Sequence, residues 1–76
     1  MSFFSKQVRD VDGRTLKKHD EVEHLRAART GQRVIKAGDV ERVTEVDGAG
    51  GTVCTVGKFG QWDVCVLGDQ VRKVRS

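Results

Sequence analysis

The chain has no proline and no tyrosine, only one tryptophan and one methionine, and two cysteines. Without proline and tyrosine it cannot build the aromatic groove in which binding modules hold proline-rich peptides. No apolar run is long enough for a signal peptide or a membrane-spanning helix, so we expect a soluble, cytoplasmic protein that does not contact a membrane. In that compartment two cysteines are expected to stay reduced and not to form a disulfide framework.

The residue patterns of catalytic and metal sites are also missing. There is no glycine-rich phosphate loop with its lysine, no serine in a nucleophile elbow, and no histidine beside an evident nucleophile. His19 and His24 lie five residues apart and the two cysteines eleven apart, which does not fit the ligand spacing of structural zinc sites. We interpret both histidines as solvated side chains of a charged segment. The sequence therefore predicts a protein that is not an enzyme and that holds no metal or cofactor.

Seventy-six residues are enough for one small domain, residues 1–76, near the lower limit at which a hydrophobic core stabilises a fold unaided. Apolar residues make up 37% of the chain and charged residues 33%. A core this small would be supplemented by self-association or by docking onto a larger protein. This arginine- and valine-rich composition would suit a bacterial or phage accessory protein.

Short valine-rich runs separated by glycine and aspartate fill the second half of the chain and predict a β-meander. These runs are residues 39–46, 52–56, 62–67 and 70–74, with a shorter run at 33–37. An Asp-Gly pair at 12–13 predicts a tight turn after a first strand at 6–11. We expect a mainly β (α+β) fold with four to six strands.

One helix is predicted near residues 16–30. This segment is rich in helix formers, and Val22, Leu25 and Ala28 fall on one narrow apolar stripe at helical spacing. A glycine after the segment would suit a helix C-cap. The alternative is that residues 22–28 form the first strand of a small barrel, which so thin a stripe also allows.

Three segments give the chain a fold-level resemblance to the SH3-like and KOW-type small β-barrels. They are the glycine-aspartate turn into a strand at 36–40, the glycine entry to a central strand at 50–53, and the closing basic strand at 71–74. The resemblance implies a small barrel that binds peptides, RNA, DNA or other protein subunits. The missing aromatic groove argues against peptide binding of the SH3 type.

A hairpin centred on Phe59 and Gly60 would pair position i with position 119 − i, which places Cys54 opposite Cys65. The two thiols could form a redox-sensitive disulfide or half of a metal site. We favour the simpler interpretation that they are two small residues filling one apolar face, because free cysteine buries readily.

Two groups of residues are candidates for binding a partner. Lys58, Phe59 and Trp62 surround the predicted hairpin tip, where the rings could stack on bases or anchor a protein, although Trp62 is favoured as a core residue. The second group consists of basic residues from the two ends of the chain: Arg26, Arg29, Arg33, Arg72, Lys73 and Arg75. These ends could form one basic surface.

Two functions follow from these features. The first is a non-enzymatic binding module that acts in protein–protein interaction or as an assembly subunit. The alternative is a small nucleic-acid-binding barrel that uses the basic ends and the aromatic hairpin tip.

Overall fold

The computed structural model describes residues 7–30, 33–57 and 63–75. Within these ranges the chain forms seven strands and one short 3-10 turn, η1. The elements are β1 (Glu21–His24), β2 (Ala28–Thr30), β3 (Arg33–Ile35), β4 (Val40–Asp47), β5 (Thr52–Val56), β6 (Val64–Leu67), η1 (Gly68–Gln70) and β7 (Val71–Arg75). The mainly β prediction is confirmed, and all five valine-rich runs contain strands.

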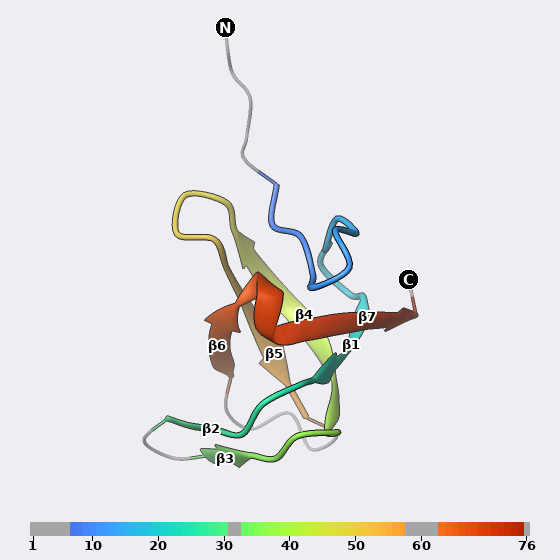
Figure 1. Ribbon diagram of the computed structural model, residues 1–76. Helices are drawn as coiled ribbons and strands as arrows, with labels where there is room; N and C mark the ends of the chain where they lie inside the picture. The colour runs from blue at the N-terminus through green and yellow to red at the C-terminus, as the bar shows by residue number, and fades with distance from the viewer. Residues whose placement is uncertain (1–6, 31–32, 58–62, 76) are drawn as a thin grey trace, which may run out of the picture.

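Five of the strands form one antiparallel sheet with the order β6-β5-β4-β1-β7. The strands β2 and β3 form a separate hairpin, which lies at the foot of the molecule in Figure 1. The large sheet has β6 and β7 as its two edges and is not closed into a barrel, so the predicted barrel closure is not observed. The count of four to six strands is too low, because the segment predicted as a helix supplies two more.

The helix predicted near residues 16–30 is wrong. A turn follows Leu16 instead: the backbone N–H of Asp20 donates to the carbonyl of Lys17, and His19 has a left-handed φ of 81°. The strand β1 then lies between β4 and β7 and hydrogen-bonds to both. Ladders on both sides of β1 outweigh the helix propensity of the segment, which is a weak preference when tertiary pairing competes. The alternative of a strand at 22–28 is nearer to the structure, although the strand there divides into β1 and β2.

Among the described residues, the core consists mainly of valine. Along β6, and along β5 as far as Thr55, buried side chains alternate with half-buried or exposed ones, as expected for strands with one face on the core. The buried cluster consists of Val8, Leu16, Val22, Ile35, Val43, Val53, Val64, Val66 and Val71. Trp62, the favoured additional core residue, lies outside the described residues.

The N-terminal segment forms a small hairpin that covers the edge of β7. The predicted turn at 12–13 is confirmed, with Gly13 at φ 84°, but the first strand is reduced to one bridge between Arg9 and Thr15. The carboxylate of Asp10 holds this hairpin together: it accepts hydrogen bonds from the backbone N–H groups of Asp12, Arg14 and Lys73, at 3.0, 2.8 and 2.7 Å. The bond from Lys73, together with the 3.0 Å bond from the N–H of Val11 to the carbonyl of Val71, attaches the hairpin to β7 and shields part of that edge.

The glycine-aspartate pairs at 38–39 and 68–69 both lead into strands. The first precedes β4 and the second lies in η1, just before β7. Within the described ranges, no helix is long and apolar enough to cross a lipid bilayer.

Candidate binding site

The β2–β3 hairpin and its flanking residues are the most basic segment of the chain. We call residues 25–38 the basic arm; it carries four cationic side chains, Arg26, Arg29, Arg33 and Lys36, and no acidic one. The whole chain has 14 basic and 11 acidic residues, so the remainder has 10 and 11 and a formal charge of −1. The entire excess of positive charge therefore lies on the basic arm.

Most of this charge points into solvent. Arg29 lies opposite Val34 across the hairpin, and Val34 is 58% exposed, whereas the neighbouring Ile35 is fully buried. Successive strand residues face opposite sides, so the Arg29–Val34 pair occupies the outer face of the arm. Arg26 and Lys36 are exposed as well. In the described part of the chain, no carboxylate pairs with Arg26, Arg29 or Lys36.

Backbone hydrogen bonds close the base of the basic arm. The N–H of His24, at the end of β1, donates to the carbonyl of Asp39 at 2.8 Å, and the N–H of Gly38 donates to the carbonyl of His24 at 2.7 Å. The N–H of Leu25 donates to the carbonyl of Gln70 at 2.9 Å, which ties the arm to η1. The arm therefore leaves the sheet from a fixed position.

The fourth cation of the arm, Arg33, attaches the arm to the sheet. Arg33 forms a short ion pair with Glu41 of β4, whose side chain is only 5% exposed. The other carboxylate oxygen of Glu41 accepts a hydrogen bond from the Thr55 hydroxyl at 2.8 Å, and His24 Nε2 lies 3.0 Å from the same hydroxyl. A buried carboxylate is tolerated only when charge and hydrogen bonds compensate it. Glu41 receives both, and the resulting chain links the arm to three strands of the sheet.

The hydrogen bonds also define the state of the His24 ring. Since the Thr55 hydroxyl gives its one proton to Glu41, His24 Nε2 must carry a proton and donate it to Thr55. Burial lowers the pKa of His24 from its ordinary value of 6.5, and the nearby carboxylates of Glu41 and Asp39 oppose this only in part. The ring is therefore neutral near pH 7 and has a structural role. The expectation that His24 is solvated is wrong, because it is 1% exposed; His19 is exposed as expected.

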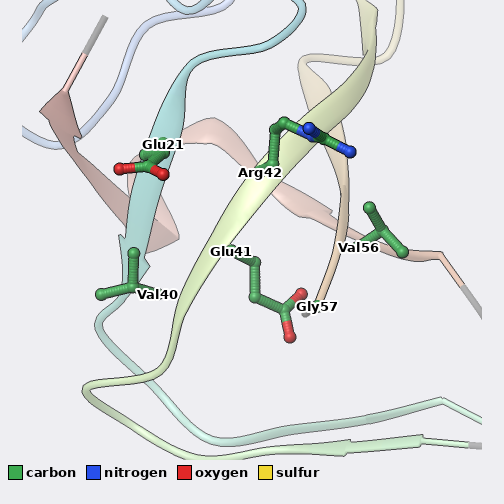
Figure 2. A pocket seen from close by; sticks show the side chains of 6 residues that line it. All are labelled: Glu21, Val40, Glu41, Arg42, Val56 and Gly57. Atoms are coloured by element: carbon green, nitrogen blue, oxygen red, sulfur yellow. The ribbon is translucent and has the colours of Figure 1, made fainter. Parts of the chain in front are cut away.

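A hollow of about 350 Å³ lies beside the Glu41 carboxylate (Figure 2). Gly57, at the end of β5, leaves room there for the ion pair: a Cβ on this residue would lie 3.2 Å from Glu41 Oε2 and 3.4 Å from Arg33 Nη2. The lining is mixed in charge and consists of Glu21, Val40, Glu41, Arg42, Val56 and Gly57. Because Glu41 is already satisfied by Arg33 and Thr55, we assign this hollow no ligand.

The C-terminal candidates lie in a different environment from the arm. Arg72 pairs with Asp12, with 2.9 Å between Nε and Oδ2, and Lys73 Nζ lies 3.3 Å from Asp20 Oδ2. Lys73 Nζ also donates to the carbonyl of Thr15 at 3.1 Å. These cations hold the N-terminal segment against β7, and the acids beside them reduce their attraction for a phosphate. One basic surface was expected from the two ends of the chain. Because Arg72 and Lys73 are paired with acids, the expected surface consists, among the described residues, of the arm alone.

Several candidates fall where the side chain is not described. Lys58, Phe59 and Trp62 lie outside the described residues. Arg75 pairs with Glu21 through its backbone at the end of β7, and its side chain is not described. Of the predicted contacts, the structure thus brings together Arg26, Arg29 and Arg33.

The cysteine register is confirmed, because Cys54 pairs with Cys65 across β5 and β6. The two sulfurs form a disulfide, so the favoured interpretation of two reduced thiols in an apolar face differs from the structure. Cys54 is half-buried and Cys65 is exposed, because the core is contacted by their neighbours Val53, Val64 and Val66.

The polar chain of Glu41, Thr55 and His24 was not predicted from the sequence. One signal was present: His24 follows Val22 at strand spacing, so both occupy the same face once the segment is recognised as a strand. The ion pair between Arg33 and Glu41 has no local sequence signature.

No three His, Cys, Asp or Glu side chains gather closely enough to hold a metal ion in residues 7–30, 33–57 and 63–75. No protein-family model matches the chain, and the comparison with curated protein sequences finds no significant match. The basic arm and its surroundings are therefore the features from which a function is inferred.

Proposed function

We propose that this protein is a non-enzymatic binding module whose basic arm contacts the phosphate backbone of a nucleic acid. The observation that carries the proposal is the separation of charge: the arm has four cations and no acid, while the rest of the chain has a formal charge of −1. Phosphate contacts supply the sequence-independent part of nucleic-acid affinity, and they require accessible cations. Arg26, Arg29 and Lys36 meet that requirement.

The way the arm is held favours binding. A flexible basic tail loses conformational entropy when it binds, whereas the arm is closed at its base by backbone hydrogen bonds and anchored by the pair of Arg33 and Glu41. Three phosphate contacts give a salt slope of about −2.7 for duplex DNA, which corresponds to a loss of about 40-fold in affinity between 50 and 200 mM salt. The expected affinity is weak, in the range of about 10⁻⁴ to 10⁻⁶ M.

The resemblance to SH3-like and KOW-type small barrels supports the same class of function. We extend that fold-level resemblance to this chain as part of the proposal, since members of the fold include proteins that bind RNA and DNA. The antiparallel meander of β4, β5 and β6 is compatible with it, although the sheet is open and β7 pairs with β1 at the other edge.

The proposal is tested with two triple variants that lose the same charge. Fluorescence anisotropy would measure the binding of labelled duplex DNA, single-stranded DNA and RNA to Arg26→Ala/Arg29→Ala/Lys36→Ala across a salt series. The matched control is Lys17→Ala/Lys18→Ala/Arg42→Ala, whose three side chains are exposed and lie outside the arm. We expect the arm variant to lose at least about tenfold in affinity and most of its salt dependence. Equal losses in both variants, or no binding at low salt by the unaltered protein, would overturn the proposal.

A protein partner or self-association is the second candidate. The observation that favours it is the edge strand β6, which pairs only with β5 in the described structure and carries Leu67 at 49% exposure. Exposed edges are natural sites for pairing with another chain. Analytical ultracentrifugation over a wide concentration range, with Leu67→Lys as the comparison, tests whether the protein self-associates through β6. A monomer at every concentration would reject it.

A further inference from the structure

A second hollow, of about 380 Å³, lies over the disulfide on the solvent side of β4, β5 and β6. Its composition follows from the strand register. Glu45 lies opposite Cys54, and Cys54 lies opposite Cys65. The next row places Asp47 opposite Thr52. Directly paired residues share a face of the sheet, so two carboxylates of β4 lie on the same face as an accessible disulfide, on its Cys54 side.

We propose that the Cys54–Cys65 disulfide is a thiol–disulfide exchange site, and that Glu45 and Asp47 select thiols that carry positive charge. The site lies on different strands from the basic arm, so its test is independent of the proposed function. Its substrate class is a cationic thiol, or a protein dithiol set in a basic surface.

Exchange at this site can be reversible because the disulfide is not part of the core. Val53, Val64 and Val66 point to the opposite face and are buried at 7% exposure or less. The β5–β6 ladder and this packing hold the hairpin in register without the sulfur–sulfur bond. The reduced thiols therefore stay opposite each other, ready to form the bond again.

The chemical step is a substitution at sulfur. An external thiolate attacks Sγ of Cys54, the cysteine that lies opposite Glu45; a mixed disulfide forms, and Cys65 leaves as a thiolate that takes up a proton. A second external thiolate then attacks the sulfur of the mixed disulfide that came from the reagent, which releases Cys54 as a thiolate that also takes up a proton. The protein disulfide gains two electrons and two protons, and the two external thiols become one disulfide.

The two carboxylates give this reaction its selectivity. A positive group on the attacking thiol is attracted by both acids, and a negative group is repelled by both. Because the site is open to water, salt should screen the effect.

The test compares the reduction rates of the oxidised protein by cysteamine, mercaptoethanol and thioglycolate, which are cationic, neutral and anionic. Mass spectrometry would follow the mixed disulfide and the free thiols, with rates expressed per thiolate and corrected for thiol basicity. We expect cysteamine to react about tenfold faster than thioglycolate at low salt, and the ratio to fall toward one at about 0.5 M salt. Circular dichroism should show that the reduced protein keeps its strands, and reoxidation should restore the disulfide.

Two charge-matched variants complete the test. Glu45→Gln/Asp47→Asn should abolish the ranking of the three thiols, and asparagine can still accept the turn hydrogen bonds that Asp47 receives from Ala49 and Gly50. Asp12→Asn/Glu23→Gln removes the same charge elsewhere and should keep the ranking. The proposal is overturned if both variants behave alike, if no thiol reduces the folded protein, or if the reduced protein unfolds.

Discussion

The hydroxyl of Thr55 donates a 2.8 Å hydrogen bond to Glu41 Oε1 while His24 Nε2 approaches the same hydroxyl from the other side at 3.0 Å. All three residues are buried and come from three neighbouring strands, β1, β4 and β5. Because Glu41 also holds Arg33, this chain connects the interior of the sheet to the basic arm. The binding surface thus depends on a polar network within an otherwise valine-built core.

Replacing Thr55 with valine should destabilise the protein although it preserves the shape of the side chain. The change removes the hydrogen-bond acceptor of His24 Nε2 and the donor to Glu41 Oε1, while Arg33 still pairs with Glu41 Oε2. We expect the free energy of unfolding to fall by about 1–3 kcal/mol in urea denaturation. Thr52→Val on the same strand is the control and should change it by less than about 0.5 kcal/mol, since Thr52 faces the opposite side. Similar effects in the two variants would argue against the network.

Replacing Arg33 should lower the free energy of unfolding much more than replacing Arg29, although both residues belong to the basic arm. Arg33→Met leaves the buried Glu41 carboxylate without its cation and should cost about 2–3 kcal/mol, less than for a fully buried pair because the Arg33 side chain is 18% exposed. Arg29→Met should cost less than about 0.5 kcal/mol, because Arg29 is exposed and pairs with no carboxylate among the described residues. Urea denaturation of both variants at one pH measures this difference. Equal costs would show that the ion pair does not anchor the arm.

Stability should fall in two steps as the solution is acidified. Burial lowers the pKa of His24 from 6.5, so below that pH the unfolded chain binds more protons than the folded one, and the free energy of unfolding decreases. Asp10 causes the second decrease in stability, at lower pH. Burial alone would raise its pKa, but three backbone N–H donors, from Lys73, Arg14 and Asp12, outweigh burial and hold the pKa below 3.8.

Stability should therefore stay level above about pH 7, decrease below 6.5, and decrease again below 3.8. Urea denaturation across this range gives the profile, with His24→Gln expected to remove the first step and Asp10→Asn the second. A profile of the unaltered protein that is flat from neutral pH down to 3.8 would contradict the role given to His24.

Replacement by alanine should lower the free energy of unfolding by different amounts at two glycines. A Cβ on Gly68 would lie 2.5 Å from both the backbone oxygen of Arg9 and Val8 Cγ1, so the N-terminal hairpin would have to move. Gly68→Ala should lower the free energy of unfolding by about 2 kcal/mol. Gly57→Ala meets only the ends of two long side chains and should cost less than about 1 kcal/mol. Thermal and urea unfolding compare the two, and the reverse order would mean that the N-terminal hairpin does not pack on η1.

Much of the sheet could be predicted from local patterns. The β5–β6 register followed from the hairpin centre and the alternation of valines, and the structure reproduces the opposition of Cys54 and Cys65. The turns before β4 and β7 were visible as glycine-aspartate pairs. These features depend on neighbours in sequence or on the two-residue period of a strand.

The features that escaped prediction depend on contacts between distant segments. At the start of β4, Val40 is 54% exposed and Glu41 is 7% exposed, the reverse of their hydrophobicity. This orientation is stable because Arg33 and Thr55 satisfy the carboxylate, and neither is its neighbour in sequence. The strand β1 was mistaken for helix for a similar reason, since its partners β4 and β7 follow much later in the chain.

The most direct test of the account is a backbone-amide NMR titration of the protein with a short duplex DNA at low salt. If the basic arm is the contact surface, the largest shifts will occur in residues 25–38, reverse when salt is added, and disappear in Arg26→Ala/Arg29→Ala/Lys36→Ala. Shifts centred on β7 and the N-terminal hairpin, or a spectrum that does not change, would contradict the assignment of the arm as a nucleic-acid-binding surface.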